Sequence, residues 1–453
     1  MKLDELAGLR VAVFGFGREG RSVLALLRRE LPGQVPSLFC TPQEAAGVAA
    51  LDDVDVRTEV PTVDDLAAFD VVVKSPGISP YRTPVAEAMA RGTRFTSATA
   101  LWFAEHPEAR VVGVTGSKGK STTAALIAHL LRVAGRRVAL AGNIGLPLTE
   151  LWRPDPAPDV WVVELSSYQT RDCAALDMAV VTALFPEHLD WHGSVERYFA
   201  DKLALLQGAR LRVLHAGDIE IGRRVAPRAG DLGFGNGEGW HPHGEHVARG
   251  TQTFALPPAF ALVGVHNRMN LSAALTVVEA LGEDAARLLP ALASFRALPH
   301  RLQPLGERGG REWIDDSIAT TPQATLAALE ALGERPLALI VGGHDRGLDW
   351  APLVERLRRL PLRAVVCQGD SGPRIAAQLR DELPGQSVTL TADFTEAVAQ
   401  ARAAAGEGGL VLLSPGAPSF PGFRDFSERG RRFAELAGFD VADPLGIGGL
   451  GIH

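Results

Sequence analysis

One segment of the chain has the residue types and spacing that bind phosphate. Residues 115–122 read Thr-Gly-Ser-Lys-Gly-Lys-Ser-Thr, after an apolar run and before an apolar pattern with helical spacing from Ser121 to Val133. A glycine-rich loop between a strand and a helix directs backbone N–H groups at phosphate oxygens. Lys120 would reach the outer phosphates, and the Ser121 hydroxyl would bind Mg²⁺. The segment therefore predicts the use of a nucleoside triphosphate.

Polar side chains also follow two later apolar runs. Glu164 ends the predicted strand over 160–167, and His188 follows the predicted strand over 178–184. Mg²⁺ prefers hard oxygen ligands, often one or two carboxylates together with substrate phosphates. Glu164 with Ser121 therefore fits a nucleotide-bound Mg²⁺. His188 could bind a second cation or a substrate carboxylate, and a structural histidine is the alternative.

Lysine is rare in this chain, at five of the 46 basic residues. Arginine can replace the charge of lysine, but it cannot lose its proton or become carbamylated. Lys120 and Lys202 are therefore candidates for roles that need an amine. The alternative is a genomic bias towards arginine that leaves a few lysines at random.

A glycine-rich turn near the N-terminus is a second candidate phosphate site. Gly15, Gly17 and Gly20 follow a predicted strand over 11–14 and begin a predicted helix that ends near Arg29. Such a turn can hold any diphosphate at a helix N-terminus. No acidic residue ends a second strand near Cys40, which argues against nicotinamide binding.

Composition limits the class of protein. The chain has 453 residues, a net charge of -7 and three cysteines, Cys40, Cys173 and Cys367. The charge argues against nucleic acid or an anionic membrane as a partner, and the cysteine spacing supports neither a disulfide framework nor a zinc cluster. No uncharged apolar run reaches about 18 residues, and no basic-then-apolar leader is seen. A cytoplasmic protein without membrane insertion is expected.

The order of predicted elements indicates an α/β fold. Strands alternate with helices throughout, which predicts three consecutive Rossmann-like or P-loop doubly wound domains with mainly parallel sheets. The predicted domains are 1–108, 109–298 and 299–453. Residues 233–250, with three histidines (His241, His243 and His246), are expected to form a solvated loop rather than a metal cluster. The glycine-rich tail 446–453 is expected to fray.

Three predicted strand ends in the last domain carry polar groups. Residues 315–320 precede a helix that Thr321 caps and that has Pro322 in its first turn. Residues 342–347 and 414–420 follow two other strands. These three ends, facing one crevice, predict a site for a small acidic substrate.

Taken together and in order, these motifs resemble the Mur ligase family over essentially the whole chain. The set comprises 115–122, 164–167, 187–190, 266–270, 300–301, 316–317 and 414–415. Within the family, the resemblance is to the ligases that add glutamate to UDP-N-acetylmuramoyl-L-alanine. It implies an ATP- and Mg²⁺-dependent reaction through an acyl phosphate, with one domain each for the UDP-sugar, ATP and the amino acid. A monomer is expected.

The resemblance also implies roles for individual residues. Catalytic roles are implied for Lys120, Glu164, His188 and Lys202, and metal binding for Ser121, Glu164, His188 and Lys202 as a carbamate. ATP contacts are implied for Gly116, Ser117, Lys118, Gly119, Lys120, Ser121, Thr122, Asn267, Asn270, Arg301 and Asp316. UDP-sugar contacts are implied for Gly15, Gly17, Arg18, Gly20, Ser75, Pro76, Gly77, Asn143, Ser166 and His188. Glutamate contacts are implied for Thr320, Arg346, Ser419, Phe420 and Phe426.

The enantiomer of glutamate depends on a departure from the pattern of the D-glutamate enzymes. Those enzymes usually have lysine where this chain has Ile318, and often lysine where it has Arg346. The local sequence resembles a branch that adds L-glutamate, so L-glutamate is expected. D-glutamate is the alternative, and a folylpolyglutamate synthase or another amide ligase of the superfamily is a more distant one.

Overall fold

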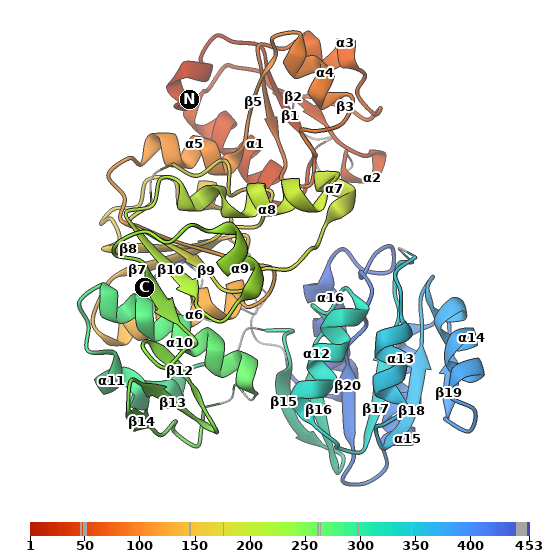
Figure 1. The fold of residues 1–453 in the computed structure, drawn as a ribbon. Helices are drawn as coiled ribbons and strands as arrows, with labels where there is room; N and C mark the ends of the chain where they lie inside the picture. The colour runs from red at the N-terminus through yellow and green to blue at the C-terminus, as the bar shows by residue number, and fades with distance from the viewer. Residues whose placement is uncertain are drawn as a thin grey trace. The chain divides into compact units, whose positions relative to one another are not determined.

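The computed structural model describes residues 1–453 except 46, 47, 49–51, 145, 175, 261, 263, 297, 298, 346 and 441–450. The chain forms two compact units. The first comprises Met1–Phe260, Val265–Phe295 and Gly449–His453, and the second comprises Ala261–Gly264 and Arg296–Gly448. Figure 1 colours the chain from red at the N-terminus to blue at the C-terminus. The three predicted domain boundaries remain our proposal. Residues 1–108, 109–298 and 299–440 each hold a mainly parallel sheet, but the last strand, β21 Gly451–Ile452, joins the sheet of the middle region.

The first sheet has five parallel strands in the order β3-β2-β1-β4-β5. Its strands are β1 Val11–Phe14, β2 Ser37–Phe39, β3 Asp55–Arg57, β4 Val71–Lys74 and β5 Arg94–Thr96. Its helices are α1 Arg18–Glu30, α2 Pro42–Ala45, α3 Val63–Ala67, α4 Val85–Ala90 and α5 Ala98–Glu105. β1, β4 and the turn that begins α1 lie where the sequence predicted them.

The second sheet has seven strands in the order β11-β10-β9-β6-β8-β7-β21. They are β6 Val111–Thr115, β7 Val138–Gly142, β8 Val160–Glu164, β9 Met178–Val181, β10 Leu211–His215, β11 Leu232–Phe234 and β21 Gly451–Ile452. The helices of this region are α6 Lys120–Val133, α7 Leu189–His192, α8 Val195–Leu203, α9 Ile219–Arg224, α10 Val265–Ala280 and α11 Ala285–Leu288. β6 is the middle strand of this sheet and is buried along its whole length. The loop that follows it therefore lies at the carboxyl end of the central strand.

Two glycine-rich segments differ from the prediction. Much of 233–250 is not a loop, because β12 Trp240–His243 and β13 His246–Arg249 pair with β14 Gln252–Phe254 as an antiparallel sheet. Trp240 is buried, its ring centroid lies 5.1 Å from that of Phe254, and β12 packs against α10, so burial against this helix orders the segment. The end of the tail also does not fray, because β21 pairs antiparallel with β7. The rest of the tail lies outside the described residues.

Two strands are shorter than predicted. β8 ends at Glu164 because the chain then turns, and the Gln169 side chain accepts a hydrogen bond from Ser166 N at 3.0 Å. β9 ends at Val181 because the next residues bind the loop after β6: Ser117 N donates to the carbonyl of Ala183 at 2.7 Å. In both cases the strand ends where the chain reaches the candidate site.

The second unit has a six-stranded sheet in the order β15-β16-β20-β17-β18-β19. Its strands are β15 Gln303–Arg308, β16 Arg311–Asp315, β17 Leu337–Val341, β18 Leu362–Cys367, β19 Val388–Leu390 and β20 Leu410–Leu413. Its helices are α12 Pro322–Leu332, α13 Ala351–Leu357, α14 Gly372–Glu382, α15 Phe394–Ala405 and α16 Phe426–Ala437, and α12 packs against α13 (Figure 1). The sequence did not predict β15, which pairs antiparallel with β16.

Alternate residues of this sheet face two different cores. Leu337, Leu339 and Val341 of β17 belong to one hydrophobic cluster, whereas Ala338 and Ile340 belong to another. Since successive strand residues point to opposite faces, helices must cover both sides of the sheet. The doubly wound architecture predicted from the sequence is thereby confirmed.

Candidate functional site

The loop between β6 and α6 has the shape of a phosphate cradle. Gly116 has φ +148° and Gly119 has φ +86°, so both residues adopt backbone conformations that side chains disfavour. A Cβ atom at Gly116 would lie 2.0 Å from Thr182 Oγ1. Lys120 is the first residue of α6, and its Nζ donates to the carbonyls of Gly116 at 2.9 Å and Ser117 at 3.2 Å. The expected order of strand, glycine-rich loop and helix is present.

The predicted amide pair on α10 lies beside this loop. A Cβ atom at Gly119 would come within 2.3 Å of Asn270 Oδ1. Asn270 Nδ2 donates to Asn267 Oδ1 at 3.4 Å, so both side chains share a face of the helix. Asn267 lies inside α10 rather than at its start, so it does not cap this helix. The structure therefore brings Asn267 and Asn270 to the phosphate loop.

Glu164 is a buried carboxylate at the end of β8. Its side chain is 1% exposed, and Oε1 accepts a hydrogen bond from Asn143 Nδ2 at 2.9 Å. Its other oxygen, Oε2, is buried without a hydrogen-bond partner among the described residues. A buried carboxylate oxygen without a partner is costly. The missing partner points to a ligand, and a divalent cation is a suitable one.

Lys202 of α8 points into the same site. Its Nζ donates to the carbonyl of Gly116 at 2.8 Å, on the loop that also holds Lys120. Burial, reinforced by the charge of Lys120, lowers the pKa of Lys202 well below its usual value. A lowered pKa supplies the free amine at neutral pH, and the free amine is the form that reacts with carbon dioxide.

His188 completes the group. It adopts a left-handed backbone conformation at the start of α7, with φ 55° and ψ 39°. Burial lowers its pKa, and the nearby charges of Lys202 and Lys120 add to this effect. Its ring lies 5.3 Å from that of Tyr168, between centroids. The imidazole is thus kept neutral, the form that can bind a cation.

These residues fit Mg²⁺ only if the substrate completes the ligand set. Within the described ranges, no three side chains of His, Cys, Asp or Glu gather into a metal site. Ser121 is the second residue of α6, and Glu164 Oε2 has no hydrogen-bond partner among the described residues. Mg²⁺ commonly takes one or two protein oxygens and fills its shell with phosphate and water. The donor set therefore fits a nucleotide-bound Mg²⁺.

The N-terminal turn is built for close approach. A Cβ atom at Gly20 would lie 2.0 Å from the carbonyl oxygen of Gly15, and Ser75 Oγ donates to that oxygen at 3.0 Å. The turn and the 75–77 segment, which includes Pro76 and Gly77, therefore lie side by side. Gly17 and Arg18, at the start of α1, are exposed, so a ligand can reach the helix N-terminus.

The predicted acidic-substrate crevice has its own network in the second unit. Asp316 is buried; it accepts hydrogen bonds from Ser414 Oγ at 2.7 Å and from Leu302 N at 3.1 Å. Burial raises the pKa of Asp316 to about 7. Arg301, whose charge opposes this rise, has a buried Nε without a hydrogen-bond partner among the described residues. The strand ends at 315–320, 342–345 and 414–420 adjoin one another through β16, β20 and β17.

The predicted glutamate residues lie around the same strand ends. Thr320 and Phe426 are half-buried and Ser419 is buried. The exposed ring of Phe420 is tilted against His344, with centroids 4.4 Å apart. Arg346 lies outside the described residues. Phe426 begins α16, and Ser317 Oγ donates to its carbonyl at 2.8 Å. The network at Ser317 thus connects this helix to the segment that contains Thr320.

Comparison with known proteins identifies the family. Residues 114–278 match the Mur ligase middle domain, and residues 300–416 match the Mur ligase, glutamate ligase domain. A UDP-N-acetylmuramoyl-L-alanine--L-glutamate ligase of Xanthomonas euvesicatoria pv. vesicatoria is 49% identical over 100% of both chains. The protein of the same name from Salinispora tropica is 42% identical over 96% of this chain and 98% of its own. The chain belongs to the Mur ligase family.

Solved structures share the fold of this Mur ligase. The UDP-N-acetylmuramate-alanine ligase of Thermotoga maritima has a TM-score of 0.61 at 20% identity, covering 94% of this chain and 98% of its own. The MurF ligase of Thermotoga maritima, solved in complex with ADP, has a TM-score of 0.57 at 18% identity, with 96% of each chain covered.

Two buried groups of this Mur ligase were not assigned roles from the sequence. Arg429 is fully buried in α16, donating to Ser317 Oγ at 3.0 Å and to the carbonyl of Ala417 at 3.1 Å. Burial lowers its pKa to about 9. Asp201, beside Lys202, is also buried and accepts several hydrogen bonds. Arginine and aspartate are usually exposed, so the sequence contained no signal for their burial.

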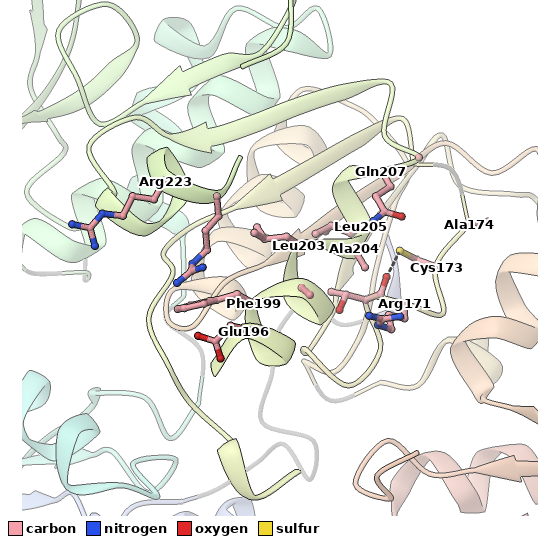
Figure 2. A pocket seen from close by; sticks show the side chains of 14 residues that line it. Arg171, Cys173, Ala174, Glu196, Phe199, Leu203, Ala204, Leu205, Gln207 and Arg223 are labelled. Atoms are coloured by element: carbon pink, nitrogen blue, oxygen red, sulfur yellow. Dashed lines mark hydrogen bonds between the residues drawn. The ribbon is translucent and has the colours of Figure 1, made fainter. Parts of the chain in front are cut away.

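A hollow of about 830 Å³ lies away from the predicted site residues (Figure 2). It is lined by one face of α8, including Phe199 and Leu203, and by Arg171 and Arg223. Lys202 is not among its lining residues, because that side chain is directed to Gly116. None of the predicted site residues lines this hollow, so it carries no part of the functional assignment.

Proposed function

We propose that the chain is an ATP-dependent ligase that joins L-glutamate to UDP-N-acetylmuramoyl-L-alanine. The observation that carries this proposal is the gathering of Lys120, Lys202 and Glu164 at the phosphate loop. The substrates are proposed from the printed names of full-length relatives at 49% identity. The reaction belongs to the synthesis of peptidoglycan precursors, and through it to cell shape and division.

The proposed chemistry has two steps. The L-alanine carboxylate attacks the γ-phosphorus of ATP, the bond to the β-phosphate oxygen breaks, and ADP leaves. The amine of glutamate then attacks the acyl carbon, loses a proton, and expels inorganic phosphate. Phosphorylation is needed because a free carboxylate is a poor acyl donor. Two anions must approach in the first step, so cationic groups must offset their charge.

The residues of the first unit suit that first step. Lys120 begins the helix whose N-terminus faces the loop, where it can pair with the outer phosphates. Lys202, as its carbamate, and His188 would lie beside the attacking carboxylate. Mg²⁺, when bound by Ser121, Glu164 and phosphate oxygens, would offset phosphate charge. Asn267 and Asn270 would contact ATP next to Gly119.

The second unit supplies the proposed glutamate pocket. Thr320, Ser419, Phe420 and Phe426 surround the strand ends, and we assign Arg346 to the same pocket. Arg301 and Asp316 would contact ATP from this unit. Ile318, in place of a lysine, favours L-glutamate over D-glutamate, and the L-glutamate names of the relatives support this preference. A folylpolyglutamate synthase is disfavoured because these relatives cover the whole chain.

The N-terminal turn would bind the UDP-sugar. We assign Gly15, Gly17, Arg18 and Gly20 to the diphosphate, together with Ser75, Pro76 and Gly77. Asn143 and Ser166 would contact the sugar-peptide. The proposed partners are these small molecules. We also propose that the protein is a cytoplasmic monomer and that it does not bind nucleic acid. No helix in the described ranges combines the length and apolarity needed to cross a bilayer.

Phosphate release from ATP tests this proposal. The assay contains UDP-N-acetylmuramoyl-L-alanine with either L-glutamate or D-glutamate. Turnover with L-glutamate alone is expected, and turnover with D-glutamate alone would reverse the enantiomer. Lys120→Ala should abolish release, and wild-type turnover by that variant would remove the assignment of the nucleotide site. No turnover with either amino acid would overturn the proposed substrates.

A further inference from the structure

A buried network directly beside Lys202 is not explained by the proposed reaction. Asp201 has a side chain that is 1% exposed, and its carboxylate accepts from Tyr81 Oη at 2.7 Å and from Arg171 Nε. His192 Nδ1 lies 2.7 Å from its other oxygen. Burial alone would raise the pKa of Asp201, but the hydrogen bonds from His192, Tyr81 and Arg171 lower it overall. Asp201 is therefore a buried carboxylate with a full set of donors.

Three side chains of this network are arranged in the order of a hydrolytic triad, but they are buried. His192 Nε2 lies 3.0 Å from Ser167 Oγ, so Asp201, His192 and Ser167 form a chain. Because a carboxylate only accepts, His192 Nδ1 carries a proton. Ser167 is 4% exposed and His192 is 0% exposed, so no substrate can reach the hydroxyl. This chain of hydrogen bonds therefore links α7, α8 and the segment that follows β8.

Tyr81 connects the 75–77 segment, which lies beside the N-terminal turn, to this network. Tyr81 lies four residues after Gly77, the last residue of the segment that we assign to the diphosphate. In the same segment, Ser79 Oγ donates to the carbonyl of Trp191 at 2.7 Å, and Trp191 Nε1 donates to the carbonyl of Pro76 at 3.1 Å. The rings of Tyr81 and Trp191 meet edge to face at 5.6 Å between centroids. Hydrogen bonds and a ring contact thus join the 76–81 segment to α7 and to Asp201.

The other end of the network is the catalytic site. Asp201 and Lys202 are consecutive in α8, and Lys202 reaches the carbonyl of Gly116. Trp191 and His188 are joined through Tyr168, which stacks on Trp191 at 4.5 Å and lies 5.3 Å from His188. Both routes begin at the 76–81 segment and end at a proposed catalytic residue.

We infer that Asp201 and Tyr81 are positioning residues that couple occupancy of the 75–77 turn to the placement of Lys202. This inference rests on the proposed function, since it takes the turn as the diphosphate site and Lys202 as a catalytic group. Occupation of the turn would hold Tyr81 on Asp201, and Asp201 would hold α8. ATP would then be used only when the first substrate is in place.

Hydrogen–deuterium exchange of the α8 backbone amides, followed by mass spectrometry, tests the coupling, because the Lys202 side chain is itself 2% exposed and closed to an amine reagent. Uridine diphosphate alone serves as the probe, since it occupies the turn but lacks the part that would reach Lys202. In the wild type it should slow amide exchange in α8 about fivefold, a typical coupling between sites. Tyr81→Phe keeps the ring and removes the donor, and should abolish this protection while still binding uridine diphosphate.

Two further variants complete the experiment. Asp201→Asn interrupts the same link from the other side and should behave like Tyr81→Phe. Thr83→Val is the matched control, because Thr83 lies in the same segment but its hydroxyl donates to the exposed Glu87; its protection should match the wild type. Steady-state assays of Tyr81→Phe should show a lower kcat with an unchanged KM for ATP. If Tyr81 had a merely structural role, uridine diphosphate would still slow amide exchange in α8 of this variant.

The outcomes separate this inference from the proposed function. Wild-type binding of uridine diphosphate without slower amide exchange in α8 would overturn the coupling and leave the function standing. Equal protection in Tyr81→Phe and the wild type would also overturn it. Absence of uridine diphosphate binding, together with absence of turnover, would overturn both.

Discussion

Lys202 Nζ donates a 2.8 Å hydrogen bond to the carbonyl of Gly116, so an amine from α8 reaches the backbone of the phosphate loop. Because this amine is buried beside Lys120, its pKa is lowered and the neutral form is favoured. A neutral amine can take up carbon dioxide and become an anionic carbamate. The contact thus joins the nucleotide loop to the residue that we assign to the acyl-transfer step.

Replacement of Lys202 tests the carbamate. Lys202→Ala should lose at least about 100-fold in kcat, as expected when an electrostatic group at the reacting centre is removed. Formate or acetate should restore part of the activity by supplying the missing carboxylate. Lys202→Arg is the control, because its guanidinium cannot be carbamylated and fills the space. Full activity of Lys202→Ala without added carboxylate would contradict the assignment.

A comparison of Gly119 with Gly135 distinguishes the effect of a left-handed backbone conformation from the effect of a close neighbouring atom. Gly119 and Gly135 have almost the same φ, +86° and +87°, but only Gly119 faces a neighbour, Asn270 Oδ1. Both Gly119→Ala and Gly135→Ala should lose about 1 kcal/mol of stability from the left-handed backbone conformation. Only Gly119→Ala should also lose nucleotide binding, measured by calorimetry with ADP. Equal ADP affinity in the two variants would show that the contact with Asn270 is unimportant.

The raised pKa of Asp316 predicts a pH dependence of stability. Its pKa of about 7 in the folded protein lies above the usual value for aspartate, so the folded state holds a proton that the unfolded state has released. Stability should therefore fall as pH rises through the window between about 4 and 7, by about 1.4 kcal/mol per pH unit. Asp316→Asn cannot titrate and should lack this component.

Urea unfolding of both proteins at pH 5, 6 and 7 measures that component. The stability of the wild type relative to Asp316→Asn should decline over this range and level off above pH 7. A constant difference would mean that Asp316 is ionised in the folded protein throughout.

Ile318 tests the enantiomer preference. It is half-buried, and its N–H donates to the carbonyl of His300 at 3.0 Å, so its backbone is anchored while its side chain can be exchanged. Ile318→Lys should raise the ratio of D- to L-glutamate turnover by about tenfold or more, because a new cation would pair with a differently placed carboxylate. Ile318→Val is the control and should keep the wild-type ratio. An unchanged ratio in the lysine variant would exclude this position as a determinant.

The sequence by itself determined the local structure and the chemistry of the phosphate loop. A buried strand, a glycine-rich loop and a helix are specified by residues that are adjacent in the chain, so β6, Gly116, Gly119 and α6 lie where the pattern predicted. The cap at Thr321 is local for the same reason, since its side chain accepts from Ala324 N. Alternation of strands and helices was sufficient for the doubly wound class.

Only the tertiary structure decided which distant residues meet. The pairing of Asn143 with Glu164, the approach of Asn270 to Gly119 and the burial of Asp201 with Tyr81 join elements far apart in the sequence. The ordered ribbon around Trp240 was missed for the same reason, because its stability comes from packing against α10 rather than from its own glycine-rich sequence. Local propensity is a property of a segment, but burial and hydrogen-bond partners depend on how the sheet brings separate segments together.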